Sequence, residues 1–207
     1  MKFRLSTKDL KVALDKVAKN DPDICAALKV VGYPRQRRSG APSYEHLLRI
    51  IVGQQLSVKA SATIYGRLEA AMGEVIPENF LNKSNQALRG FGLSRQKIDY
   101  GQVLSKAVLD GFNPRDLIKK SDREVLEAIT ALRGFGRWSA EMFLMFSLGR
   151  PDIWPADDLA VQEAVKRLKN LKTRPKPREM DAIAEAWRPH RGAVAVFLWH
   201  FYSNAPL

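Results

Sequence analysis

A glycine-rich turn and a pair of aspartates are the two features of this sequence whose residue types and spacing could do chemistry. The segment Ala131-Leu-Arg-Gly-Phe-Gly136 places one residue between two glycines. This spacing allows a tight turn with positive φ and leaves backbone N–H groups open to a phosphate oxygen. Asp157 and Asp158 follow after mostly apolar sequence about as long as one helix, and either carboxylate could cap a helix or take part in a reaction. A turn of this kind can hold a nucleic-acid backbone without reading its bases.

Two helices are expected to position this turn. Residues 121–124, Ser-Asp-Arg-Glu, have the form of a capping box, and apolar residues follow at helical spacing, so the first helix is predicted to run into Gly134. The second helix is predicted to begin at Arg137 and to end at Gly149, before Pro151. The sequence therefore predicts a helix-hairpin-helix.

The six residues of the turn occur twice, at 87–92 and at 131–136. The flanking residues differ, since a tryptophan lies just after the second copy but not after the first. We interpret the first copy as the end of one helix and the start of the next, with Arg95 and Lys97 as a modest additional phosphate contact. Chemistry is assigned only to the second copy.

Composition narrows the class of protein. The formal net charge of +12 and the pI of about 10.0 suit a polyanionic partner, although charge alone is equally compatible with a protein that is merely basic. One cysteine and three histidines are too few for a disulfide framework or a metal-ligand cluster. No apolar run is long enough to span a bilayer and no leader is evident, so we expect a soluble protein, cytoplasmic (nucleoid-associated) or nuclear.

Apolar residues recur at helical spacing through the rest of the chain, and no segment shows sustained two-residue alternation, so the predicted fold class is all-α. Residues 33–42 are polar, basic and rich in helix breakers, and predict an exposed connection whose charges, from Arg35 to Arg38, could touch phosphates or simply be solvated. A loop is expected from Gly73 past Pro77. The other predicted helices cover the residues from Ser6 to before Asp21, 24–31, Ser43 to Gly53, 58–72, 97–109, 114–120, Pro155 to Leu168, 178–187 and 193–202.

Gln54 and Gln55 stand between two apolar helices. A buried amide must find hydrogen-bond partners for both its oxygen and its nitrogen. The two side chains are therefore expected at a surface or in a cleft.

Three motifs together resemble the helix-hairpin-helix (HhH-GPD) DNA glycosylase superfamily, and within it the DNA-3-methyladenine glycosylase II branch. The hairpin alone is shared with many non-catalytic DNA-binding modules, whereas the combination is specific. The similarity extends over most of the chain, from about Tyr33 to Tyr202. The motifs are residues 132–140 with Asp158 twenty residues after Trp138, the loop 53–57, and residues 187–191 followed by Trp199.

The resemblance implies an architecture of two helical lobes with a DNA-binding cleft between them. One lobe would comprise residues 40–149 and end in the hairpin, and the other residues 1–39 together with 150–207. The chain looks like a short form without the N-terminal β domain of longer members, and it has too few cysteines for an iron–sulfur cluster. No cofactor is expected, although hairpin carbonyls in the superfamily can hold a monovalent cation. The expected partner is double-stranded DNA with a damaged base, bound by a monomer.

The activity implied is that of a monofunctional DNA glycosylase in base excision repair, which flips and excises alkylated purines of the 3-methyladenine and 7-methylguanine type. Hydrolysis of an N-glycosidic bond builds positive charge on the sugar, and a nearby carboxylate stabilises it. The resemblance gives this catalytic role to Asp158, whereas Asp157 is expected to cap the helix; residue chemistry alone would allow the opposite. The alternatives are a bifunctional glycosylase/lyase and a non-catalytic helix-hairpin-helix DNA-binding module.

Trp138 occupies the position at which bifunctional relatives carry their Schiff-base lysine, which implies base removal without strand cleavage. An indole face also suits a cationic flipped base, although a tryptophan one turn into an amphipathic helix often belongs to the core. Gln55 aligns with the side chain that fills the space left by the flipped nucleotide. The implied base-pocket residues are Trp138, Trp199, Met142 and His200. The expected DNA-binding residues are Gln54, Gln55, Ser57, Arg133, Gly134, Phe135, Gly136, Arg137 and Ser139.

Overall fold

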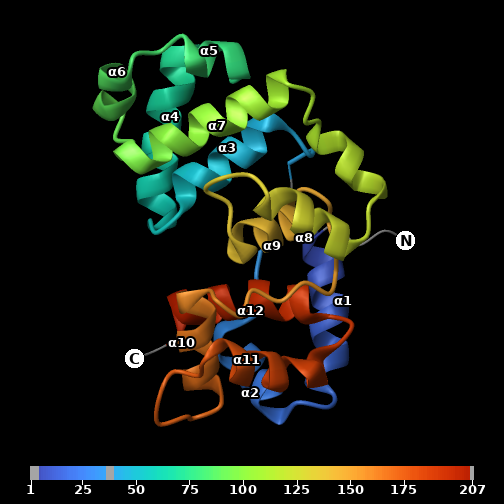
Figure 1. Ribbon diagram of the computed structural model, residues 1–207. Helices are drawn as coiled ribbons and strands as arrows, with labels where there is room; N and C mark the ends of the chain where they lie inside the picture. Colours follow the sequence, from blue (N-terminus) through green and yellow to red (C-terminus); the bar gives the residue numbers. More distant parts are fainter. Residues whose placement is uncertain (1–4, 36–39, 206–207) are drawn as a thin grey trace. The chain divides into compact units, whose positions relative to one another are not determined.

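The computed structural model describes residues 5–35 and 40–205, and within them every regular element is a helix (Figure 1). The all-α prediction is therefore confirmed. No helix in the described part of the chain is both long and apolar enough to cross a membrane. The α-helices are α1 (Thr7–Ala18), α2 (Pro22–Val31), α3 (Tyr44–Gly53), α4 (Val58–Met72), α5 (Pro77–Leu81), α6 (Asn85–Gly90), α7 (Arg95–Leu109), α8 (Asp122–Thr130), α9 (Arg137–Phe146), α10 (Leu159–Leu168), α11 (Pro177–Ala184) and α12 (Arg191–Asn204), with 3₁₀ segments at Pro114–Lys119 and Glu185–Trp187.

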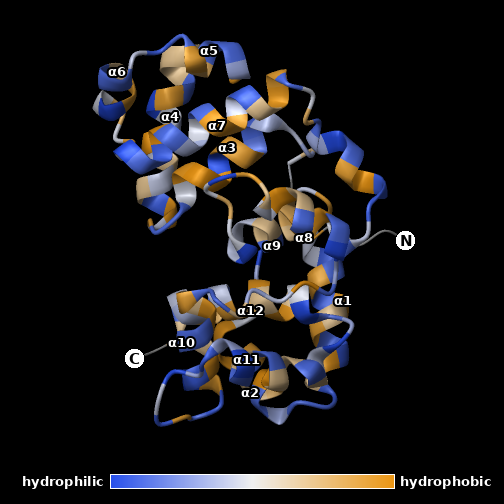
Figure 2. Cartoon of the chain, in the orientation of Figure 1, coloured by the Kyte–Doolittle hydropathy of each residue, from blue (hydrophilic) through white to orange (hydrophobic). Residues whose placement is uncertain are grey.

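The chain divides into two compact units. The terminal unit comprises Met1–Ser39 and Leu144–Leu207, and the central unit comprises Gly40–Phe143. The division falls inside α9, a few residues before the boundary at 149 expected from the sequence. Each unit has apolar and polar residues interspersed along its helices, as amphipathic helices require (Figure 2).

Helix α12 forms the core of the terminal unit. Seven consecutive residues, 192–198, are buried, and the helix packs against α10, α1 and α2. A buried polar cluster fastens the N-terminal part of the chain to this core. Asp21, 8% exposed, accepts two hydrogen bonds from Lys169 Nζ at 2.9 Å and one from Trp187 Nε1 at 2.7 Å.

Helix α7 is the centre of the central unit and packs against α3, α5 and α6. The contact with α5 is close, because a Cβ added at Gly101 would lie 2.4 Å from the ring of Phe80. The contact with α3 includes a buried hydrogen bond of 2.8 Å between the hydroxyl groups of Tyr44 and Ser105. These contacts fix the start of α7 beside the loop that follows α3.

Local hydrogen bonding explains most helix starts. The Ser121–Glu124 capping box predicted at the start of α8 is present, and Ser6 and Ser43 cap α1 and α3. The predicted 58–72 helix agrees with α4 at both ends. Residues 36–39 of the basic connection lie outside the described residues.

Several expectations about helix limits were wrong. The second hairpin helix ends at Phe146 rather than at Gly149. The segment after Gly73 is not a loop throughout, because it forms α5 and α6, which are too short to show apolar periodicity. The first hairpin helix ends at Thr130 rather than at Gly134. Pro155 does not begin a helix. It begins a turn closed by a hydrogen bond of 3.1 Å from Asp158 N–H to Pro155 O, and α10 starts after this turn at Leu159.

Candidate active site and nucleic-acid interface

Asp158, at the start of α10, accepts two hydrogen bonds with one carboxylate oxygen. Its Oδ1 accepts a hydrogen bond of 2.9 Å from Val161 N, which makes it the N-cap residue of the helix. The same oxygen accepts a hydrogen bond of 3.1 Å from Trp199 Nε1. The expectation that Asp157 would cap this helix was wrong, because the helix begins one residue later; Asp157 is exposed. The carboxylate of Asp158 is thus held at the positive end of a helix dipole by two donors.

Trp199 reaches Asp158 from the second half of α12. Its indole lies against Phe146, with the ring centroids 6.0 Å apart and the planes inclined by 36°. The indole is only half-buried, whereas the residues that precede it on the helix are fully buried. The structure therefore brings together two of the residues predicted for the site, the carboxylate of Asp158 and the indole of Trp199.

The other predicted pocket residues have different surroundings. The ring of His200 is hydrogen-bonded through Nε2 to Val31 O at 2.9 Å and through Nδ1 to Asn204 at 3.1 Å, so it is directed at the end of α2. Met142 is buried in the central unit, at 6% exposure. Trp138 is half-buried in the first turn of α9 and belongs to the same unit as Met142.

The hairpin turn, residues 131–136, requires glycine at one of its two glycine positions. Gly134 has a φ of +97°, and a Cβ there would lie 2.2 Å from the ring of Tyr100. Gly136 lies outside the left-handed region, and a Cβ there would meet nothing within 4 Å. The positive φ that the glycine spacing allows therefore occurs at Gly134. Phe135 anchors the turn, since it is 5% exposed and its N–H donates to Leu132 O at 3.0 Å.

Arg133, Gly136 and Arg137 are exposed around this anchored turn. Arg137 Nε also donates to Glu141 Oε1 at 2.8 Å along α9. The first N–H groups of a helix point away from its body and have no partner within the helix. An exposed turn that leads directly into a helix N-terminus is the geometry that binds a phosphate.

The loop between α3 and α4, residues 54–57, is here called the glutamine loop, and Gln54 joins it to the hairpin. Its Nε2 donates to Gly134 O at 2.8 Å and to Ser139 Oγ at 3.1 Å. Ser139 is 2% exposed, whereas Gln54 and Gly134 are half-buried. Gln54 and Ser139, both predicted to contact DNA, are thus joined to each other by a hydrogen bond. Ser57, also predicted to contact DNA, is exposed and caps α4 through Ala60 N.

Gln55 stands at the tip of this loop, exposed and with a φ of +56°. Lys97 supports the loop from α7, because its Nζ donates to Val52 O and to Gln54 O, each at 2.8 Å. Burial lowers the pKa of Lys97. A polar cavity of about 220 Å³ lies between the loop, the start of α7 and the hairpin, and its lining residues are Gln54, Gln55, Ser94, Gln96, Lys97, Tyr100 and Gly134.

Sequence reasoning missed what Lys97 and Tyr100 do. Lys97 was expected to contact phosphate, but its ammonium group donates to the backbone carbonyls of Val52 in α3 and Gln54 in the loop that follows. The first copy of the repeated hexapeptide thus leads into the helix that supports the second copy, through Tyr100 against Gly134. The repeated hexapeptide drew attention to both regions of the sequence, but it did not predict that they are in contact.

Within the described residues, no group of three or more His, Cys, Asp or Glu could hold a metal ion. The arrangement instead offers a fixed carboxylate beside an indole in one unit. The other unit offers an exposed glycine turn and a loop with the exposed Gln55. A glycine turn between two helices, α8 and α9, defines the class of protein as a helix-hairpin-helix protein.

Comparison with known proteins identifies the family. The chain belongs to the HhH-GPD superfamily of base excision DNA repair proteins, which it matches over residues 48–189. It is 33% identical over 179 residues to DNA-3-methyladenine glycosylase 1 of Schizosaccharomyces pombe, a match that covers 83% of this chain and 78% of that protein.

Solved structures agree with this assignment. The 3-methyladenine DNA glycosylase Mag1 of S. pombe, in complex with abasic DNA, superimposes with a TM-score of 0.85 at 32% identity, over 90% of this chain and 94% of that one. A DNA-3-methyladenine glycosidase of Bacillus halodurans superimposes with a TM-score of 0.72 at 31% identity, over 90% and 87% of the respective chains.

Proposed function

We propose that this protein is a monofunctional DNA glycosylase that excises alkylated purines by hydrolysing the N-glycosidic bond. One observation carries the proposal: in a chain of a base excision repair family, the Asp158 carboxylate is fixed by hydrogen bonds from Trp199 Nε1 and Val161 N. The relatives named 3-methyladenine glycosylases, one of them in complex with abasic DNA, support the substrate class and the product.

Asp158 supplies the chemistry of this reaction. As the bond between base and sugar breaks, positive charge develops on the sugar, and a fixed carboxylate stabilises that charge without having to reorganise. The same group can orient or deprotonate the attacking water. Trp199 donates to one carboxylate oxygen, which fixes the rotation of the carboxyl group about its side chain.

Trp138 determines the type of product. No imine can form between an indole and the sugar, so the enzyme releases the base and leaves the strand intact. Methylation makes the purine cationic, and an electron-rich ring face binds a cation through cation–π attraction. Trp138 is therefore assigned to the wall that stacks on the extruded base.

The central unit holds the DNA. The Gly134–Gly136 turn binds a backbone phosphate through its N–H groups, and Gln55 fills the space left by the extruded nucleotide. Gln54 and Lys97 keep the glutamine loop in place through the hydrogen bonds described above. The enzyme acts on double-stranded DNA as a monomer, a state that light scattering during gel filtration measures.

The test is a comparison of two adjacent aspartates. Asp158→Asn should bind duplex DNA containing a methylated purine yet release the base at least about 100-fold more slowly, because the charge-stabilising group is neutral. Asp157→Asn is the matched control, and it should release base at nearly the parent rate. Single-turnover release of the free base, with strand cleavage scored with and without alkali, measures both properties. Equal rates for Asp158→Asn and the parent, or strand cleavage without alkali, would refute the proposal.

A further inference from the structure

The segment that leads into Asp158, residues 150–157, contains no helix and must be held in place by tertiary contacts. Its middle is buried: Trp154 is 3% exposed and its ring meets Trp187 edge-on at 5.3 Å, and Ala156 O accepts a hydrogen bond of 2.7 Å from Gln162 Nε2. Two further sets of hydrogen bonds join this part of the chain to α12, one near the start of the segment and one at Asp158, directly after its end. Asp158 and Trp199 form one set, and Pro151 and Asp152 take part in the other.

The start of α12 needs the partners that residues 151 and 152 provide. The N-cap residue, His190, makes no side-chain capping hydrogen bond. The first two N–H groups of the helix are instead satisfied by the preceding segment, since Arg191 N donates to Asp152 Oδ1 at 3.3 Å and Gly192 N donates to Pro151 O at 2.9 Å. The carboxylate at this position also complements the positive end of the helix dipole.

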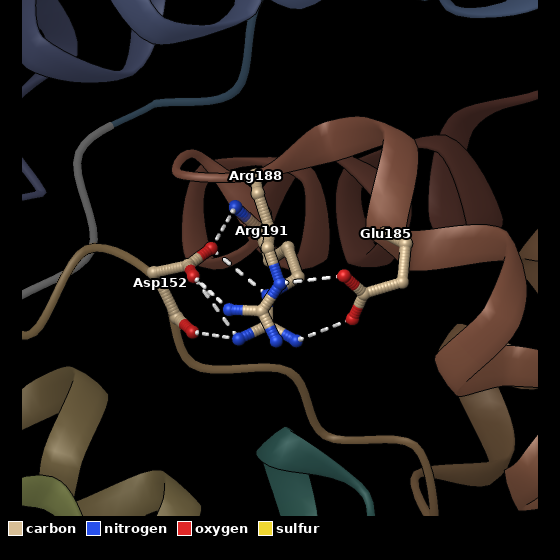
Figure 3. A network of polar contacts seen from close by, with 4 residues as sticks. All are labelled: Asp152, Glu185, Arg188 and Arg191. Carbon is tan, nitrogen blue, oxygen red and sulfur yellow. Dashed lines mark hydrogen bonds and ion pairs between the residues drawn. The ribbon is translucent and has the colours of Figure 1, made fainter.

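Arg191 makes the attachment rigid. Its Nε donates to Asp152 Oδ1 at 2.9 Å, and its Nη2 donates to Asp152 Oδ2 at 3.0 Å and to the backbone O of the same residue at 2.7 Å (Figure 3). A guanidinium that grips both a carboxylate and a backbone carbonyl fixes direction as well as distance. Arg191 is 14% exposed and Asp152 is 23% exposed, so water screens this pair less than an open surface pair.

Gly192 allows the backbones to approach. A Cβ at this position would lie 2.8 Å from Pro151 O, a distance that real Cβ contacts essentially never show, and 3.3 Å from Pro151 C. Trp199 follows Gly192 by seven residues on α12, which is close to two turns at about 3.6 residues per turn, so both residues face the same side. The segment from Pro151 to Asp158 therefore contacts one face of α12 at Gly192 and again, roughly 10 Å along the helix axis, at Trp199.

We propose that Asp152, Arg191 and Gly192, together the Asp152 clamp, are positioning residues that set the register of Asp158 against Trp199 and hence the orientation of the catalytic carboxylate. The inference rests on the proposed function for its effect on rate, whereas its effect on the Asp158–Trp199 hydrogen bond is independent of that function. The motif at residues 187–191, noted in the sequence for its resemblance alone, thereby acquires a physical role.

The experiment compares two arginines that both bind Asp152. Arg188 Nη1 donates to Asp152 Oδ2 at 2.7 Å, but its side chain is 48% exposed, against 14% for Arg191. Both arginines also pair with Glu185. Arg191→Gln and Arg188→Gln make the same charge change three residues apart. Arg191→Gln should slow single-turnover base release on the order of 10-fold to 100-fold, the range expected for a displacement of about 1 Å or less, and Arg188→Gln by less than about threefold.

A second readout follows the hydrogen bond itself. The Trp199 indole N–H resonance, assigned with Trp199→Phe, should shift and exchange faster with solvent in Arg191→Gln and in Asp152→Asn, and should stay at its parent position in Arg188→Gln. Asp152→Asn preserves the size of the side chain, so it decides the question even where Arg191→Gln does not fold. Affinity for DNA carrying an abasic-site analogue should change little in Asp152→Asn.

Each other outcome is decisive. An unchanged Trp199 resonance in both Asp152→Asn and Arg191→Gln overturns the Asp152 clamp, whether or not the melting temperature falls. A slower rate with an unchanged resonance overturns it as well, because the effect then does not pass through Asp158. A parent protein that releases no methylated purine overturns the proposed function, and the resonance still decides whether the clamp sets the hydrogen bond.

Discussion

Replacing Gly134 with alanine should destabilise the hairpin in two separable ways. The first is backbone strain, because the residue has a φ of +97°, and L-residues with a side chain pay roughly 1–2 kcal/mol in left-handed conformations. The second is steric. The new Cβ would lie 2.2, 2.4 and 2.6 Å from three ring atoms of Tyr100, whereas carbon atoms in contact are usually about 3.5–4.0 Å apart.

The expected magnitude follows from these two contributions. Overpacking of a filled site costs about 1–3 kcal/mol, so Gly134→Ala should lower the free energy of unfolding by about 2–5 kcal/mol in total. Relief of the overlap would move the Gly134 carbonyl, which accepts from Gln54 Nε2 at 2.8 Å, so the glutamine loop should also lose order. Gly136→Ala is the matched control, because a Cβ there meets nothing within 4 Å.

A double-mutant cycle measured by urea unfolding separates the contributions. In a Tyr100→Ala background, Gly134→Ala should cost only the backbone share of about 1–2 kcal/mol, which gives a coupling energy of about 1–3 kcal/mol between the two positions. Gly136→Ala should change stability by less than about 0.5 kcal/mol, yet weaken DNA binding in fluorescence anisotropy because its methyl group occupies the approach of the phosphate. An equal cost of Gly134→Ala with and without the Tyr100 ring would refute the steric argument.

Two further predictions concern buried polar groups. Burial raises the pKa of Asp21, but hydrogen bonds from Lys169, Trp187 Nε1 and Ile24 N outweigh burial and leave that pKa lowered. The ionised Asp21 therefore stabilises the fold fully above the pKa of an aspartate in the unfolded chain, about 3.9. This stabilisation is lost as the pH falls through the lowered pKa of Asp21 in the folded protein. Asp21→Asn should therefore cost about 2–4 kcal/mol at neutral pH and much less in acid, and a cost in urea unfolding that does not depend on pH would contradict this assignment. Lys97→Met keeps the apolar stem but removes the hydrogen bonds to Val52 O and Gln54 O, so amide hydrogen exchange of residues 53–57 should accelerate. The same substitution at the exposed Lys59 should leave the exchange rate of these residues unchanged. Equal exchange in the two variants would show that Lys97 does not hold the loop.

Local patterns predicted the helices well. Ser121 and Glu124 lie three residues apart and form the predicted capping box, and residues 58–72 form the predicted helix. Such features depend on hydrogen bonds between near neighbours and on apolar spacing within one helix, which are written in consecutive residues. The errors arose where those signals are short or doubled, as in α5 and α6, or where two adjacent aspartates could both cap α10.

The glutamine loop shows a contact that such reasoning could not supply. Gln54 and Gln55 were singled out because paired amides between apolar helices lacked a packing purpose, and both were predicted to contact DNA. The structure gives Gln54 a purpose inside the protein, through a hydrogen bond to Gly134, which lies 80 residues further along the chain. No spacing rule connects residues so distant, because the contact exists only once α7, α8 and α9 have packed.

By itself, then, the sequence determined the helical class, the hairpin, the basic character and the residue types available for chemistry, since composition, capping and periodicity act over a few residues. Tertiary structure alone decided that Asp158 rather than Asp157 caps α10 and accepts from Trp199, 41 residues away. It also decided that Asp152 meets Arg191, 39 residues away, at the start of the helix that carries Trp199. The physical reason is that a carboxylate acquires its orientation from donors on other elements, and those donors come within hydrogen-bonding distance only when the core around α12 is formed.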